Sequence, residues 1–160
     1  MKLNVRQDID LPIARVYARL SDFDGWQKAA LRRGAEVART DKLDRYAPGM
    51  TWTAAFAYRG KQRHLDLALD AIVPPDHLAF SGAGPNLGGT LSIDLIEMAP
   101  SRTRVVVKLE IKPRTLVARL FIQSLKLGRA SVEEKFRTRV AQVLAEVERP
   151  DQTPRRRSAG

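Results

Sequence analysis

Hydrophobic residues recur with two different periods along this chain, and the change between them is the strongest limit on its fold. From about residue 35 to residue 112, apolar and polar side chains alternate, as in residues 65–69. Alternation of this kind is typical of half-buried strands. After Pro113 the period becomes 3.6 and continues to about Glu148, which predicts a long amphipathic helix. Gly128 is a candidate position for a bend in that helix.

The residues before this region add one strand and two short helices. Leu3, Val5 and Ile9 alternate with polar neighbours, and Pro12 suits the first turn of a helix that reaches Leu20. A second short helix is predicted over about residues 25–33. The fold class is therefore α+β, with an antiparallel sheet of about six or seven strands and a long C-terminal helix. The apolar face of the sheet is the only large surface available to cover that helix.

Residues 82–89 form a glycine-rich stretch, GAGPNLGG. A strand follows it instead of a helix, and the Lys-Ser/Thr ending of a phosphate-binding loop is missing. We therefore predict a flexible loop between two strands, which is a candidate part of a cavity mouth.

Two stretches of the sequence carry a resemblance to a known superfamily. Residues 9–26, IDLPIARVYARLSDFDGW, are similar to the opening of SRPBCC proteins, and residues 71–80, AIVPPDHLAF, are similar to their central strand-turn-strand. This superfamily includes START domains, polyketide cyclase/dehydrase-like proteins and the birch-pollen-allergen group. The resemblance covers residues 1–148 and implies a helix-grip domain, in which the sheet wraps the long helix around a cavity. It implies no catalytic residues.

The chain after this domain is predicted to be a basic, disordered tail over residues 149–160. It contains Arg155, Arg156 and Arg157 and has no apolar side chain large enough to anchor it.

The residue types that carry most catalytic and metal chemistry are scarce. The chain has two histidines and no cysteine. His64 shares the outward face of its strand with Asp66, and His77 lies in a Pro-Pro-Asp-His turn. Zinc sites usually gather three or four ligands, so no metal site or cofactor is predicted. No serine lies in a Gly-x-Ser-x-Gly elbow. We therefore predict no catalytic residues.

The inward faces of the predicted sheet and helix supply the candidate ligand-binding residues, although the same side chains also suit an ordinary core. This set comprises Trp52, Phe56, Tyr58, Leu67, Leu69, Phe80, Leu91, Ile93, Val107, Leu109, Phe121 and Phe136. Arg63 and Glu97 fall in register with inward residues near strand ends. They are the charged candidates for contacting a polar ligand head, and the alternative is that both are solvated rim residues.

Three functions are compatible with these features. The first is non-catalytic binding or transport of a hydrophobic small molecule, such as a lipid, an isoprenoid quinone or a polyketide-like compound. The second is a polyketide cyclase/dehydrase-like enzyme. The third is a basic module with a filled core that acts at an anionic membrane or an acidic protein surface, since the net charge is +10.

Other partners and the location follow from composition. Nucleic acid is disfavoured because Arg104, Lys108 and Lys112 have no aromatic neighbours. A homo-oligomer stays open. The absence of cysteine and of an apolar N-terminal signal segment predicts a cytoplasmic location.

The first part of the C-terminal helical region is more apolar than one sheet can cover. Between Thr115 and Leu127 the apolar side chains spread over roughly 240° of the helix, against about 120° from Val132 onward. We expect the excess to face a cavity entrance, a second subunit or a membrane, flanked by the cations Arg114, Arg119, Lys126 and Arg129. The alternative is that the two short helices cover it.

Overall fold

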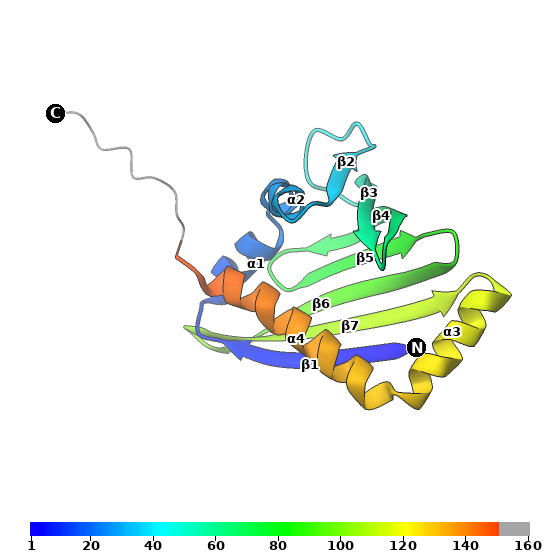
Figure 1. The fold of residues 1–160 in the computed structure, drawn as a ribbon. Helices are drawn as coiled ribbons and strands as arrows, with labels where there is room; N and C mark the ends of the chain where they lie inside the picture. Colours follow the sequence, from blue (N-terminus) through cyan, green and yellow to red (C-terminus); the bar gives the residue numbers. More distant parts are fainter. Residues whose placement is uncertain (151–160) are drawn as a thin grey trace.

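The computed structural model describes residues 1–150, and these form one sheet and four helices (Figure 1). The elements follow in the order β1 (Lys2–Ile9), α1 (Ile13–Leu20), α2 (Phe23–Arg32), β2 (Glu36–Arg39), β3 (Thr51–Tyr58), β4 (Lys61–Val73), β5 (His77–Ala83), β6 (Leu87–Ala99), β7 (Arg102–Pro113), α3 (Leu116–Leu127) and α4 (Arg129–Glu148). None of these helices combines the length and the apolar character that crossing a bilayer requires. The predicted tail lies, from residue 151 on, outside the described residues.

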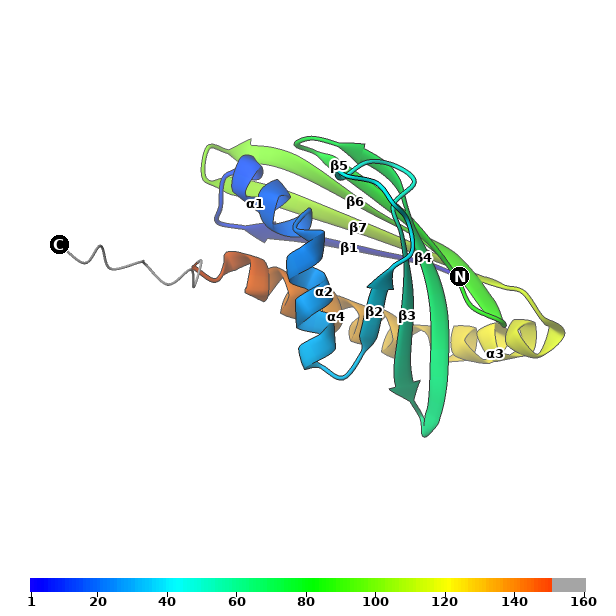
Figure 2. The same cartoon turned by 90° about the horizontal axis from the view of Figure 1, so that it is seen from above.

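The sheet has seven strands in the order β1-β7-β6-β5-β4-β3-β2, and every neighbouring pair is antiparallel. β1 returns to the edge beside β7, with Val5 opposite Val107. Figure 2 shows how strongly the sheet twists, since β3 and β4 run across the direction of β1 and β7. The predicted α+β architecture is therefore confirmed, with the long helix on the concave face of the sheet.

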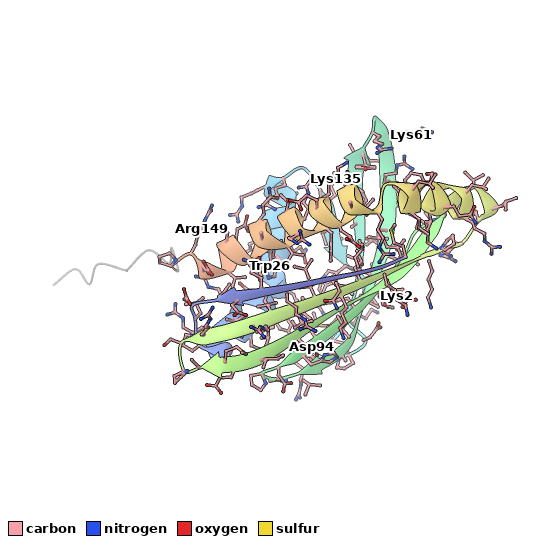
Figure 3. The ribbon with its side chains drawn as sticks, turned by 90° about the horizontal axis from the view of Figure 1, so that it is seen from below. Lys2, Trp26, Lys61, Asp94, Lys135 and Arg149 are labelled. Atoms are coloured by element: carbon pink, nitrogen blue, oxygen red, sulfur yellow. The ribbon has the colours of Figure 1, made fainter. Side chains whose placement is uncertain are left out.

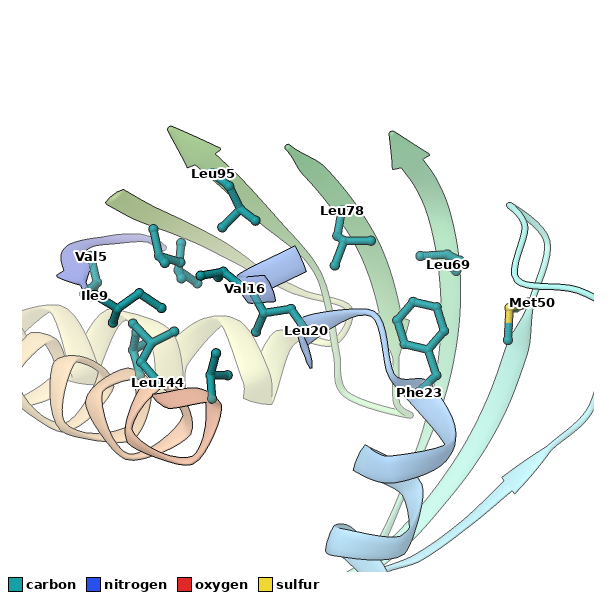
Figure 4. Packing of buried hydrophobic residues seen from close by; sticks show 14 of the residues in the cluster. Val5, Ile9, Val16, Leu20, Phe23, Met50, Leu69, Leu78, Leu95 and Leu144 are labelled. Atoms are coloured by element: carbon teal, nitrogen blue, oxygen red, sulfur yellow. The ribbon is translucent and has the colours of Figure 1, made fainter. Parts of the chain in front are cut away.

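The largest group of deeply buried side chains lies where α1 and α4 meet β1 and β7, while Met50, Leu69 and Leu78 are equally buried at or beside β3, β4 and β5. Ile9, Val16, Val105, Leu144 and Val147 are each at most 2% exposed, and several of them are seen together in Figure 4. Each recurs at the strand or helix period of its own element. One buried polar residue belongs to this region: the Thr103 hydroxyl donates to the carbonyl of Leu11 at 2.8 Å, so its burial leaves no unpaired group.

The C-terminal helical region is divided at Gly128. Gly128 has φ −109° and ψ 36°, and it serves as the C-cap of α3 and the N-cap of α4. Its N–H donates to the Leu125 carbonyl, while its own carbonyl accepts from Ser131 and Val132. The predicted bend is thus a complete break, and two helices leave it in different directions (Figure 1).

The prediction of a flexible loop at residues 82–89 is wrong. β5 continues to Ala83 and β6 begins at Leu87, so only residues 84–86 connect the strands. A Cβ added to Gly89 would lie 2.5 Å from the backbone oxygen of Glu110 on β7. Gly89 is therefore explained by the close approach of the neighbouring backbone and not by loop flexibility.

The prediction that His77 lies in a turn is also wrong. His77 is the first residue of β5 and is paired across the sheet with Asp94. Its Nδ1 lies 2.7 Å from Asp94 Oδ1. Asp94 projects from the side of the sheet away from α4 (Figure 3). The pair therefore lies on the outer face and takes no part in the interior.

Candidate ligand-binding cavity

An apolar cavity of about 310 Å³, open to solvent, lies between α2 and the concave face of the sheet. Its volume falls near the lower end of the range for small-molecule sites. Helices α1, α2 and α4 and strands β2 to β6 contribute to the lining. It consists of Leu20, Phe23, Trp26, Gln27, Ala30, Val37, Trp52, Leu67, Phe80, Ile93 and Val143. Gln27 is the one lining residue with a polar amide, and none of the eleven carries a carboxyl, amine, imidazole or hydroxyl group.

Local hydrogen bonds fix α2 over this cavity. Asp22 caps the helix by accepting from the N–H of Gly25 at 3.1 Å. The Trp26 indole Nε1 donates to the Arg19 carbonyl, and Gln27 Nε2 donates to the Val37 carbonyl, both at 3.0 Å. Because these donors are already satisfied within the protein, the surface offered to a guest is almost wholly apolar.

An aromatic cluster shapes one wall of the cavity. Phe23 lies at its centre, with its ring 5.6 Å from that of Trp52 and 5.9 Å from that of Phe80, both in edge-to-face contact. Tyr46 packs on the same ring at 4.8 Å. Such pairs add specific geometry to apolar burial. The wall is therefore formed by rings that hold one another in place.

The segment between β2 and β3, residues 40–50, is held against this cluster by Asp41. The Asp41 carboxylate accepts from the guanidinium of Arg39 and from the backbone N–H groups of Leu43 and Thr51, each of these two at 2.9 Å. The Arg39 guanidinium and these N–H groups hold the pKa of Asp41 well below its ordinary value. This ionised carboxylate thus organises the segment that carries Tyr46.

Four of the predicted ligand-binding residues line the cavity: Trp52, Leu67, Phe80 and Ile93. The others lie elsewhere. Leu69 and Val107 are buried in the core; Phe56, Leu91, Leu109 and Phe136 are partly buried; and Tyr58 and Phe121 are exposed at 54% and 42%. Contact between any of these side chains and a ligand stays a prediction.

The two charged candidates are not brought together. Arg63 on β4 lies opposite Phe56 on β3. The Nε atom of Arg63 is buried without a hydrogen-bond partner among the described residues. Glu97 is exposed beside an irregularity near the end of β6. The Tyr17 hydroxyl is the other buried polar atom without a partner in this part of the chain, and burial raises the pKa of that phenol. Arg63 therefore keeps an unused donor on the inward face of its strand.

The predicted set of ligand-binding residues contains no residue of α2, although four residues of this helix line the cavity. Phe23, Trp26 and Ala30 lie at positions i, i+3 and i+7, which is the spacing of one helix face. That pattern indicates a covered face but does not say what it covers. The neighbouring strand β2 adds Val37, whose position opposite Ala54 depends on long-range pairing.

Comparison with known proteins places the fold. No family model and no curated protein sequence matches the chain. Among solved structures, the Zhui aromatase/cyclase from Streptomyces sp. R1128 is similar, with 16% identity, a TM-score of 0.67 and coverage of 93% of this chain and 94% of that one.

Two further solved structures show the same likeness. A START superfamily protein from Mycobacterium smegmatis has 10% identity and a TM-score of 0.57, covering 84% of this chain and 95% of its own. Ara h 8.0201, a Bet v 1-like allergen, has 14% identity and a TM-score of 0.55, covering 91% and 98%. At these identities the likeness establishes the fold alone, which is the helix-grip fold.

Proposed function

We propose that this protein binds an apolar small molecule in the cavity beneath α2 and carries or senses it without changing it chemically. The observation that carries the proposal is the lining itself. The rings of Phe23, Trp26, Trp52 and Phe80 border this space, and the Trp26 indole and the Gln27 amide already donate to backbone carbonyls of the protein. Such a surface gains free energy from an apolar guest and offers few polar contacts for a hydrophilic one.

The same lining favours binding over catalysis. Proton-transfer chemistry requires a titratable group within hydrogen-bond reach of the substrate, and none of the eleven lining residues supplies an acid or a base at ordinary pH. The likeness to an aromatase/cyclase is a likeness of fold, and function resides in the site. We therefore place the carrier or sensor ahead of a cyclase-like enzyme.

The cavity also indicates the shape of the guest. A space of about 310 Å³ walled by aromatic rings suits a single ring system or part of an acyl or isoprenoid chain. Arg63 lies four residues from Leu67 on the same face of β4, which corresponds to about 13 Å along a strand. A guest that reached from the cavity to the unused Arg63 donor would be elongated, with an anionic or hydrogen-bond-accepting head.

Titration with a fluorescent fatty acid and with anilinonaphthalene sulfonate tests this function. Wild-type protein should bind both saturably, and mass spectrometry should recover the fatty acid unchanged. Ala30→Phe places a ring in the cavity and should weaken binding by about tenfold or more. Ala18→Phe, the same substitution at an exposed position of α1, is the matched control and should bind like wild type.

Two results would remove the proposal. One is the absence of saturable binding to folded wild-type protein. The other is equal affinity of the Ala30→Phe and Ala18→Phe variants, provided that circular dichroism shows both to be folded.

A further inference from the structure

Helix α3 presents large apolar side chains to solvent along most of its length. Ala118 and Ile122 are buried beneath it, at 5% and 4% exposure. The opposite side is uncovered: exposure runs from 42% for Phe121 to 93% for Leu127, and the full set is Leu116, Val117, Leu120, Phe121 and Leu127. We call these five residues the α3 apolar face. At about 100° per residue they cover an arc of roughly 140°.

The short helices do not cover this face. α1 and α2 lie toward the other end of the sheet in both Figure 1 and Figure 2. α3 packs instead on β7 and on the start of α4. The alternative in which α1 and α2 bury the excess apolar surface is therefore wrong.

The helix is held firmly while its face stays exposed. At its start, Thr115 Oγ1 accepts from the Ala118 N–H at 3.1 Å, and the Arg114 guanidinium donates to the Gly84 carbonyl at 3.0 Å. At its end, the Arg129 guanidinium donates to the Lys2 carbonyl at 3.1 Å. α3 is thus a fixed element of the fold, anchored to the β5–β6 connection and to β1.

The charged residues of α3 itself are all cations. Residues 111–132 contain no aspartate or glutamate, and of their cations Lys112 and Arg129 are paired with Glu110 and Glu133, just outside this range. Arg119 and Lys126 lie about 60–80° from the edge of the α3 apolar face on the helical wheel. Both are exposed, and neither forms an ion pair with a described residue. An apolar strip with cations beyond one of its edges suits a helix that lies in a membrane interface.

We propose that the α3 apolar face docks on an anionic lipid bilayer, a function beyond ligand binding in the cavity. Val117, Leu120 and Phe121 enter the acyl boundary, while Arg119 and Lys126 reach the phosphate and carboxylate groups of the lipid heads. A second copy of the chain fits this surface less well. A two-fold contact through α3 would bring Arg119 and Lys126 near their own counterparts, and α3 itself carries no carboxylate to pair with them.

Flotation with lipid vesicles tests the proposal. Wild-type protein should bind vesicles in which phosphatidylserine replaces a third of the phosphatidylcholine, and added salt should weaken the binding. It should bind phosphatidylcholine vesicles much less. The double variant Val117→Gln/Leu120→Gln should lose at least about tenfold in affinity. The double variant Arg119→Gln/Lys126→Gln should lose about fivefold for each cation removed.

Matched controls remove the same groups elsewhere. Leu31→Gln/Met98→Gln changes two exposed apolar residues outside α3, and Lys42→Gln/Arg45→Gln removes two exposed cations. Both controls should bind vesicles like wild type. None of the α3 residues lines the cavity, so all variants should bind the fluorescent fatty acid normally, which separates this test from that of the proposed function.

Three outcomes would overturn the proposal. The first is that folded wild-type protein does not float with the anionic vesicles. The second is that the controls and the α3 variants lose binding equally. The third is a stable dimer by sedimentation that Val117→Gln/Leu120→Gln dissociates, which would assign the face to a second copy of the chain.

Discussion

The concave face of the sheet is filled at one end and hollow at the other. Where β1 and β7 meet α1 and α4, Val105 and Leu144 are at most 2% exposed. Where β3, β4 and β5 meet α2, Leu69 and Leu78 are also buried, but Leu67 and Phe80 are only partly buried and line a cavity of about 310 Å³. The strands of both ends carry apolar faces of the same kind. The difference lies in the covering helix, since α4 packs on β1 whereas α2 packs on β2 at the opposite edge (Figures 1 and 4).

This contrast shows that an alternating strand pattern does not decide between a core and a binding site. Filling requires a helix that brings large side chains down onto the strand face, as Leu144 and Val147 do. At the hollow end, α2 meets the sheet with Phe23, Trp26 and the small Ala30, which leaves space between them.

The largest stability effect should come from the filled end. Leu144→Ala removes a side chain that is 2% exposed and leaves a void in a packed region. We expect it to lower the free energy of unfolding by about 2–5 kcal/mol, measured by urea denaturation. Fatty-acid affinity of the remaining folded protein should not change. A loss below about 1 kcal/mol would show that this end is loosely packed and would remove the contrast.

Phe80→Ala should produce a smaller loss at the hollow end. The ring of Phe80 already borders empty space, so less contact is removed than at Leu144. We expect about 1.5 kcal/mol by the same denaturation experiment, together with a measurable change in ligand affinity. If Phe80→Ala destabilised the fold as much as Leu144→Ala and left binding unchanged, the two ends would be equivalent.

The smallest effect on stability should follow from Asp41→Asn at the hollow end. Asp8→Asn is the corresponding substitution at the filled end. The Arg104 guanidinium lowers the pKa of Asp8, as the Arg39 guanidinium lowers that of Asp41. Because each folded-state pKa is lowered, the stabilisation is complete above the ordinary aspartate value of 3.8 and is lost as pH falls below it.

Each substitution should therefore lower Tm by a few degrees at neutral pH and flatten its fall below about pH 4. Only Asp41→Asn should also weaken ligand binding, because Asp41 organises the segment that carries Tyr46. Thermal scans against pH, with fatty-acid titration at neutral pH, check both expectations. Equal ligand affinity of Asp41→Asn and Asp8→Asn would show that Asp41 does not influence ligand binding in the cavity.

The order and type of the elements could be predicted from the sequence because each is encoded locally. Val5 and Ile9 alternate with polar residues, and Asp22 precedes a helix as its cap. At Gly128 the sequence indicated only a bend, whereas the structure has a complete break between two helices. Local signals failed at Gly89. Gly89 is required because the backbone of Glu110, on a strand more than twenty residues away, leaves no room for a side chain. The residues near Gly89 in the sequence do not indicate that contact.

The candidate site was predicted only in part for a related reason. Trp52, Leu67, Phe80 and Ile93 were found because strand alternation shows which side chains point inward. The same rule also selected Leu69 and Val107, which the structure places in the core. Whether an inward side chain meets another side chain or a cavity depends on how α2 and α4 cross the sheet, and that arrangement is set by tertiary packing.

Quenching of tryptophan fluorescence by a brominated fatty acid tests the central claim most directly. Trp26 and Trp52 are the two tryptophans of the chain, and both line the cavity. Bromine quenches an indole only at close contact, so the measurement reports the position of the guest. We predict saturable quenching in both single-tryptophan variants, Trp26→Phe and Trp52→Phe, and its loss when Ala30→Phe is added. Saturable fatty-acid binding that quenches neither tryptophan would place the ligand elsewhere and contradict the account.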